Sequence, residues 1–157
     1  MEFREDDLSG EDTIALVRAH LAHMAAVTPA DSIYALDHSG LQAADVTFWS
    51  VWDGCTIIGC AALREIDPHH GEIKSMHTVA ERRGTGIARR VLDFVIDEAQ
   101  RRGYRRLSLE TGHSAAFEAA QRLYAGAGFT PTGPFADYGP DPHSFFMTLE
   151  LDQPFKT

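Results

Sequence analysis

The stretch GEIKSMHTVAERRGTGIARRVLDFVIDEAQRR, residues 71–102, decides the fold of this chain. Its first part, Glu72 to Val79, is short and has the composition of a strand. Its last part, Ile87 to Arg101, repeats apolar residues at helical spacing. Between the two lie Gly84 and Gly86, which permit backbone conformations that other residues avoid and let a ligand approach closely. A strand, a glycine turn and an amphipathic helix are therefore expected here.

The turn has the features of an anion site. It opens directly into a helix, whose first free N–H groups and positive dipole end favour negative charge. Arginines flank it on both sides at Arg82, Arg83, Arg89 and Arg90. The run required for a P-loop, with Gly-Lys-Ser/Thr, is absent, and so is the three-glycine spacing of the dinucleotide-binding fingerprint. The stretch predicts a different kind of phosphate or pyrophosphate cradle.

Composition limits the possible partners. With 157 residues, the chain is expected to form one domain over residues 1–157. The net charge of −9 argues against general binding of nucleic acid. The basic residues concentrate between Lys74 and Arg102, and a local positive field on an acidic protein suits a small anionic ligand better than a polymer.

Cysteine usage and the N-terminus favour a cytoplasmic protein. Cys55 and Cys60 are expected to lie on opposite sides of one strand, which disfavours a disulfide. The first ten residues are too acidic and polar for a signal peptide. No apolar run approaches the roughly 20 residues that a membrane-spanning helix needs. We expect no membrane association.

Periodicity and turn signals place the other elements. A helix after Ser9 is expected, capped by Ser9 or Asp12, and a short one follows Pro29 and ends near Leu36. Two further helices are expected at Ile87–Arg101 and about 115–127, and strands at about 2–7, 45–52, 56–66, 72–79, 106–111, from 129 and at 144–151. This order predicts an α/β fold with a mixed sheet and helices on its faces, in which 72–111 forms a right-handed parallel crossover.

Two motifs resemble those of the GNAT acyltransferases. Arg83-Gly84-Thr85-Gly86-Ile87-Ala88 is similar to the coenzyme A loop of that family, Arg/Gln-x-x-Gly-x-Gly/Ala. Residues 123–129, LYAGAGF, resemble its Leu-Tyr-x-x-x-Gly-Phe signature. With the strand before the loop, the resemblance covers essentially the whole chain. More narrowly, GEIKSM, RLSLETG and PFADYG-DP-S-FM resemble a bacterial subgroup of small YsnE-type acetyltransferases, which has been associated with indole-3-acetic acid metabolism.

The resemblance implies the GNAT fold, a mixed and mostly antiparallel sheet with a splayed central strand and helices on both faces. It also implies acetyl-CoA as cosubstrate, with backbone groups of the central strand on its pantetheine arm and loop N–H groups on its pyrophosphate. Phe117 stands where the family often has asparagine, and Ser114 could replace the lost hydrogen bond. The residues expected at the coenzyme are Met76, His77, Thr78, Arg83, Gly84, Thr85, Gly86, Ile87, Ala88, Arg89, Ser114 and Phe117.

The implied chemistry is direct acetyl transfer to an amine, which needs a base for the ammonium proton and a proton for the departing sulfur. Tyr124 matches the family tyrosine near the sulfur and is the candidate donor, although a tyrosine packed on a helix face would fit the same pattern. Two carboxylates are candidate bases, Glu72 on the central strand and Glu110 on the next. A water chain or His77 is the other possibility. Strand alternation places Glu72, Lys74, Met76 and Thr78 on one face, where Glu72 could instead be a carboxylate paired with Lys74 or an arginine.

The favoured function is N-acetylation of a small-molecule amine. The alternatives are acetylation of a peptide or protein amine, and a coenzyme A-binding module without turnover. The acceptor site is expected among the N-terminal helices, the strand with Trp49 and Trp52, and the loop Phe135–His143. A metal enzyme is disfavoured, because the histidines form no His-Glu-x-x-His motif. Homodimers are common among the proteins that this chain resembles, and the sequence leaves the oligomeric state open.

Overall fold

One sheet organises the computed structural model, which describes residues 1–34 and 36–151. Its seven strands are arranged in the order β1-β2-β3-β4-β5-β7-β6. Neighbouring strands are antiparallel except for β4 and β5, which are parallel. The strands are β1 (Glu2–Glu5), β2 (Val46–Asp53), β3 (Thr56–Asp67), β4 (His70–Thr78), β5 (Arg106–Gly112), β6 (Thr130–Thr132) and β7 (Ser144–Glu150). The predicted mixed, mostly antiparallel sheet is confirmed.

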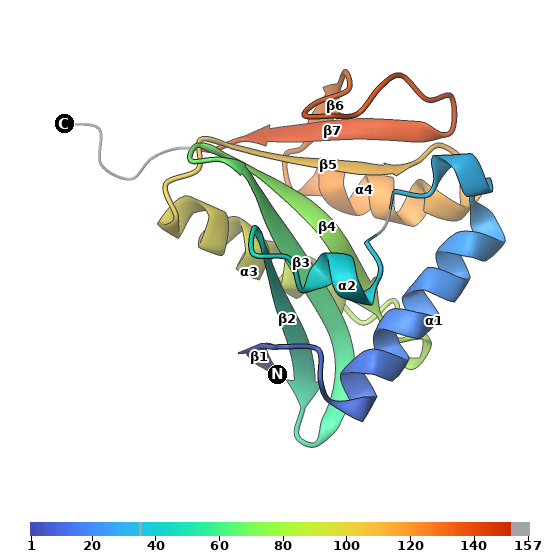
Figure 1. Ribbon diagram of the computed structural model, residues 1–157, viewed down its shortest axis with the longest axis vertical. Coiled ribbons are helices and arrows are strands. Elements are labelled where there is room, and N and C mark those ends of the chain that lie inside the picture. Colours follow the sequence, from blue (N-terminus) through green and yellow to red (C-terminus); the bar gives the residue numbers. More distant parts are fainter. Residues whose placement is uncertain (35, 152–157) are drawn as a thin grey trace.

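Helices cover both faces of this sheet, as predicted. Helices α1 (Glu11–Val27) and α2 (His38–Leu41) lie on one face, and α3 (Ile87–Arg101) and α4 (Glu118–Gly126) lie on the other (Figure 1). Each face has its own apolar core, one built on α3 and one on α1. Across the described ranges, no helix is long and apolar enough to span a bilayer.

Most elements begin and end near the predicted residues, but the N-terminal region differs. The residue before α1 is Gly10, which offers no side-chain cap, and Ser9 instead donates its hydroxyl to Asp7 at 2.6 Å. The capping role predicted for Ser9 or Asp12 is therefore wrong. A helix up to Leu36 was expected; residue 35 lies outside the described residues, and among the described residues of this segment the structure has only the 3-10 turn Ala30–Ser32. The unpredicted α2 follows, with Asp37 accepting a hydrogen bond from the Gly40 amide at 2.8 Å.

Strands β4 and β5 separate partway along their length. Their pairing begins at His70 with Arg106 and ends at Ile73 with Leu109. Strand β4 continues to Thr78 without β5 as a neighbour, and Figure 1 shows the two strands diverging. Because β4 remains paired with β3 over this length, the divergence leaves one edge of β4 without a strand partner. The predicted splay of the central strand is thus confirmed.

A β-bulge lies at the point where the strands part. Ser75 pairs with Ala62 and Ile73 with Leu63, so that Lys74 has no partner residue on β3. The extra residue changes the alternation of side chains beyond it. Met76 consequently packs into the core on the α3 side of the sheet, whereas Glu72 and Lys74 face the other side. The prediction that Glu72, Lys74, Met76 and Thr78 share one face is wrong for this reason.

Candidate functional site

The glycine turn forms an open loop at the start of α3. Gly84 and Gly86 have φ values of +77° and +85°, and a Cβ built on either would meet no atom within 4 Å. Gly86 is the residue that precedes α3, without a side-chain cap. The first helical bond runs from the Arg90 amide to the Gly86 carbonyl at 3.3 Å, so the amides of residues 87–89 have no helical acceptor. Unclaimed donors beside open space fit a bound pyrophosphate.

The arginines around the loop also have structural partners. Arg82 pairs with Asp53 at 2.9 Å. Arg83 donates from Nε to the Thr78 carbonyl at 3.2 Å, and Arg89 pairs with Asp93 at 3.0 Å. The hydroxyl of Thr85 donates to the Arg82 carbonyl at 2.5 Å and closes the turn. These contacts are mostly exposed, so the side chains remain near enough to water to exchange partners when an anion binds.

The free edge of β4 exposes the backbone of two residues that were assigned to the coenzyme. The Val79 amide bonds to the Ile58 carbonyl of β3 at 3.0 Å. Because backbone groups alternate in direction along an antiparallel pair, His77 also faces β3, opposite Cys60. Met76 and Thr78 therefore direct their N–H and C=O groups toward the gap left by β5. The register does not support a backbone contact from His77, whose ring instead lies 5.0 Å from that of His20 on α1.

Ser114 and Phe117 lie near the end of β5 in different environments. Ser114 is exposed and precedes the 3-10 turn Ala115–Phe117, which begins the region predicted as one helix. Phe117 is buried, and a Cβ on Gly112 would come within 2.2 Å of its ring. The missing side chain at Gly112 thus makes room for Phe117, which packs in the interior. Ser114 remains free to contact a ligand.

Tyr124 is held in α4 with its ring buried against Phe129, at 5.8 Å between ring centroids. Burial raises the pKa of Tyr124 to about 12, and the nearby charge of Glu110 acts in the same direction. The phenol therefore keeps its proton throughout the neutral range. In the described residues, no acceptor within the protein occupies its hydroxyl, so this group is in the state that a proton donor requires.

Glu110 lies on β5 immediately after the last residue paired with β4. Burial raises the pKa of Glu110 to about 7, with further increases from the charges of Glu72 and Asp141 and an opposing effect from Lys74. A carboxylate with this pKa can accept a proton near neutral pH without binding it permanently. Its position at the mouth of the gap makes it a suitable base for a group placed there.

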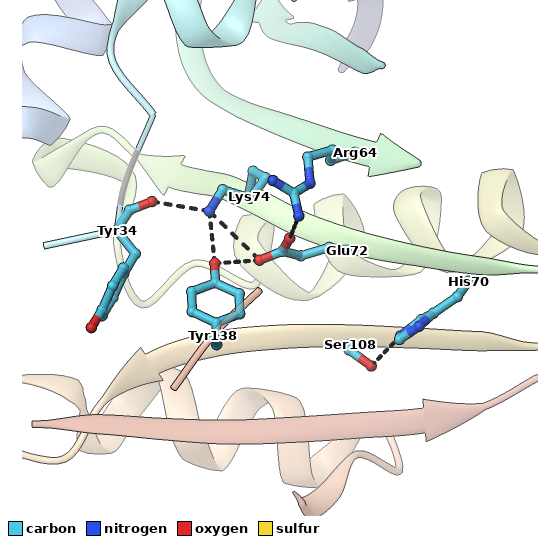
Figure 2. Close-up of polar contacts among 7 residues, drawn as sticks. All are labelled: Tyr34, Arg64, His70, Glu72, Lys74, Ser108 and Tyr138. Atoms are coloured by element: carbon cyan, nitrogen blue, oxygen red, sulfur yellow. Dashed lines mark hydrogen bonds and ion pairs between the residues drawn. The ribbon is translucent and has the colours of Figure 1, made fainter. Parts of the chain in front are cut away.

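Glu72, the other candidate base, is fully buried and bound by cations (Figure 2). Its Oε1 lies 3.3 Å from Nη2 of Arg64, and its Oε2 lies 3.6 Å from Nζ of Lys74. The Tyr138 hydroxyl donates to Oε2 at 2.5 Å. The alternative prediction, that Glu72 pairs with Lys74 or an arginine, is confirmed. A carboxylate enclosed in this way has no access to an incoming amine.

Sequence reasoning missed the network that surrounds Glu72. Lys74 donates to the Tyr34 carbonyl at 2.9 Å and to the Tyr138 hydroxyl at 2.7 Å. Tyr34 in turn donates its own hydroxyl to Asp141 at 2.7 Å. These residues are far apart in the chain and meet only because two loops fold over the sheet. A lysine two residues after Glu72 in a predicted strand was the one signal in the sequence.

Apart from the neighbouring rings of His20 and His77, the histidines with contacts in the described residues lie against other kinds of residue. His70 contacts the Ser108 hydroxyl at 2.7 Å (Figure 2), and the ring of His113 lies 5.0 Å from that of Phe145. Within residues 1–34 and 36–151, no three His, Cys, Asp or Glu side chains are grouped as metal ligands would be.

Comparison with known proteins places the chain among acetyltransferases. Residues 16–129 match the family described as "Acetyltransferase (GNAT) family". The chain is 50% identical over 151 residues to the uncharacterized N-acetyltransferase YsnE of Bacillus subtilis, covering 96% of this chain and all of that protein. It is 40% identical over 124 residues to the IAA acetyltransferase of Azospirillum brasilense, covering 78% of this chain and 80% of the relative.

A solved structure shows the same fold. The PaiA N-acetyltransferase of Thermoplasma acidophilum, determined in complex with coenzyme A, superposes with a TM-score of 0.74. The superposition covers 96% of this chain and 98% of that protein, at 16% sequence identity. The similarity extends over the whole sheet and its helices.

Proposed function

The chain belongs to the GNAT acetyltransferase family, and we propose that it moves an acetyl group from acetyl-CoA directly to the amine of a small molecule. The observation that carries this proposal is the separation of β4 from β5 beside an open loop at the start of α3. Glu110 directly follows the last β5 residue paired with β4, and its charge acts on Tyr124, so both residues are the candidates for proton transfer at this gap. Acetyl-CoA supplies an activated thioester, and the chain supplies its orientation and the proton transfers.

The coenzyme would be held by backbone groups. Met76 and Thr78 offer N–H and C=O groups to an amide-containing arm along β4, in place of the missing strand. Amides from Gly84 to Arg89 would bind the pyrophosphate at the positive end of the α3 dipole. The Thr78 carbonyl accepts from Nε of Arg83 at 3.2 Å, so this exposed arginine would have to exchange partners for the arm to use that carbonyl.

Proton transfer would use one residue on each side of the gap. Glu110 takes the proton that the amine loses as its nitrogen forms a bond to the acetyl carbon. Tyr124 gives its proton to the sulfur as the carbon–sulfur bond breaks, and it recovers a proton from solvent. The raised pKa values of both groups suit these directions, because each holds or accepts its proton near neutral pH.

Aromatic side chains support a small acceptor. The ring of Tyr138 lies 5.2 Å from that of Tyr34 and 5.0 Å from that of Phe135, on the sheet face that carries Glu72. The relative from Azospirillum is named for a small molecule, IAA. Acceptor pockets vary within a fold, so these rings favour a class of acceptor and do not identify one.

A thiol-release assay with acetyl-CoA tests the proposal across amines, amino acids and peptides. We expect turnover with small amines and only background release with peptides. Tyr124→Phe should lower turnover by about 100-fold, the scale of one proton transfer, while acetyl-CoA still raises Tm. Stabilisation by acetyl-CoA without release for any acceptor would indicate a binding module, and preference for peptides would indicate the other substrate class.

A further inference from the structure

We propose that Lys74 is a positioning residue: its ammonium group fastens two loops over the acceptor side of the site and provides the positive charge facing Glu110. This inference rests on the proposed function for its role in catalysis. The contacts themselves are independent of any activity. They involve one buried cation at the bulge where β4 leaves β5.

Lys74 is unusual because its cation is almost completely covered. Its side chain is 6% exposed, and burial lowers the pKa of Lys74 while the carboxylate of Glu72 opposes the shift. The bulge turns this side chain toward the loops and away from the α3 core. A lysine kept in such a place needs strong hydrogen bonds to offset its lost hydration.

The ammonium group joins two segments that are remote in the sequence. It donates to the Tyr34 carbonyl at 2.9 Å and to the Tyr138 hydroxyl at 2.7 Å, and Figure 2 shows both meeting at Nζ. The Tyr138 hydroxyl in turn donates a hydrogen bond to Oε2 of Glu72 at 2.5 Å. Each donor has a defined acceptor, so replacing the cation would leave the Tyr34 carbonyl and the Tyr138 hydroxyl without this partner.

The same two segments are bonded to each other. Ser32 donates to Oδ1 of Asp141 at 3.0 Å, and Tyr34 donates to Oδ2 at 2.7 Å. The amide of His143 also donates to Oδ1, at 2.9 Å. Asp141 thus forms a second link between the two loops, and it lies closer to solvent than Lys74. Lys74 ties the joined loops down to β4, and Asp141 ties them together.

Lys74 also acts on Glu110 through charge. It lowers the pKa of Glu110, against the raising effect of burial. Glu110 lies two residues beyond Ser108, the β5 partner of Glu72, and therefore on the same face of the sheet as Ser108. The charged and titratable groups coupled to Glu110 come from β4, the two loops and α4: Glu72, Lys74, Tyr34, Tyr138, Asp141 and Tyr124. Lys74 is the one cation in this set, so its removal should raise the pKa of Glu110.

Lys74→Met tests both roles without any substrate. Carbon-13 NMR of protein labelled at the glutamate carboxyl carbon would follow the Glu110 titration, assigned with Glu110→Gln. We expect its midpoint to move above the parent value of about 7. Hydrogen exchange should accelerate at the amides of Ser32, Tyr138 and His143, which are bonded within the two loops. An unchanged midpoint together with unchanged exchange would overturn the proposal.

Two matched variants separate charge from tethering. Tyr138→Phe keeps the cation and removes the hydroxyl, so exchange at Tyr138 should accelerate while Glu110 titrates near the parent midpoint. Glu72→Gln combined with Lys74→Met removes both opposing charges, so the midpoint should return toward the parent value while exchange stays fast. In Lys74→Met alone, the buried carboxylate of Glu72 loses one of its cations, which could unfold the protein. The double variant removes that carboxylate charge as well and so avoids this cost.

Activity gives a third and separate result. With an acceptor found in the thiol-release screen, the acidic limb of kcat/KM should move to higher pH in Lys74→Met and return in Lys74→Arg. NMR and exchange involve no acetyl-CoA. These two measurements can therefore contradict the role of Lys74 even if the protein transfers acetyl groups. They can also be interpreted if no turnover is found with any acceptor.

Discussion

At the scale of single residues, Glu72 and Glu110 show how the same carboxylate group acquires different functions. Glu72 lies between Arg64 and Lys74 without exposure to solvent, and it pairs with both cations. Glu110 has weaker partners and a pKa raised to about 7. Neighbouring strands carry the two residues, yet only Glu110 lies where the strands have parted.

Replacing Glu110 with glutamine should remove the base. In the parent enzyme, kcat/KM should rise with pH through about 7 as the carboxyl group loses its proton. Glu110→Gln should lower kcat/KM by about 100-fold and abolish this rise. Glu118→Gln is a suitable control, because Glu118 is an exposed residue in the first turn of α4. A pH profile retained in Glu110→Gln would assign the acidic limb to another group.

Gly86 is the residue of the loop with the most direct prediction. Acetyl-CoA should raise the melting temperature of the parent protein, because ligand at 100 times Kd adds about 2.7 kcal/mol to the free energy of unfolding. Gly86→Glu should abolish the shift, because a carboxylate would meet the phosphates. Gly103→Glu is a matched control at the other end of α3, with the same φ of +85° and an equally open Cβ position. Gly103→Glu should lose stability through backbone strain but keep the shift in melting temperature caused by acetyl-CoA. If Gly86→Glu also kept that shift, the phosphates would bind elsewhere.

At the scale of elements, the contact between β5 and the helix α4 holds Tyr124 in place. The turn Ala115–Phe117 sets the start of α4, and its buried Phe117 ring rests directly on Gly112. Gln121 of α4 adds a side-chain hydrogen bond to the Gly112 carbonyl at 2.6 Å. The end of β5 thus fixes both the direction of the chain and the start of the helix that carries Tyr124, the proposed donor.

Adding one methyl group at Gly112 should disturb this contact. A Cβ there would lie 2.2 Å from the Phe117 ring, and overpacking of this kind costs about 1–3 kcal/mol. Gly112→Ala should therefore lower the midpoint of urea unfolding. Gly133→Ala, where a Cβ would meet nothing within 4 Å, should change stability by less than about 0.5 kcal/mol. Equal stability of the two variants would show that Phe117 adapts freely.

Sequence patterns located the elements well and the side-chain directions poorly. Apolar periodicity placed α3 at its observed ends, Ile87 and Arg101, because one face of that helix is buried along its whole length. The bulge at Lys74 depends on how β3 and β4 align, which no local pattern encodes. That single extra residue put Glu72 and Met76 on opposite faces. The ion pairs that enclose Glu72, with Arg64 and Lys74, are what favour Glu110 as the candidate base.

The predicted cap of the N-terminal helix was wrong for a different reason. Ser9 has the chemistry of a helix cap, but Asp7 lies within reach and takes its hydroxyl. Similarly, Tyr34 and Asp141 meet through loops whose paths are set by tertiary contacts. Contacts between distant loops build most of the acceptor side, so sequence could indicate its aromatic character and not its geometry.

At the scale of the whole molecule, two histidines make the fold sensitive to acid. His20 on α1 and His77 on β4 lie with ring centroids 5.0 Å apart. Burial lowers the pKa of each from 6.5 to about 4. The charges of His23 and Arg83 lower the pKa of His20 further, and the charges of His20, Arg83 and His23 lower that of His77. Between these pKa values the unfolded chain binds more protons, so the free energy of unfolding decreases as pH falls from about 6.5 to 4. Glu110, with its raised pKa, acts in the opposite direction between 7 and 4.5.

Removing one imidazole should lessen this sensitivity. His20→Leu should move the midpoint of acid unfolding, followed by circular dichroism, to lower pH. His69→Leu is the control, because His69 lies exposed in the turn between β3 and β4, and its midpoint should stay close to that of the parent. An acid midpoint that does not change in His20→Leu would mean that other groups govern the transition.

A structure determined with coenzyme A bound tests the central claim most directly, because every assigned role depends on where the diphosphate lies. The account predicts the diphosphate on the amides between Gly84 and Arg89, the pantetheine arm along Met76 and Thr78, and the sulfur beside the Tyr124 hydroxyl. A diphosphate bound away from this loop, or an arm that does not enter the gap between β4 and β5, would contradict it.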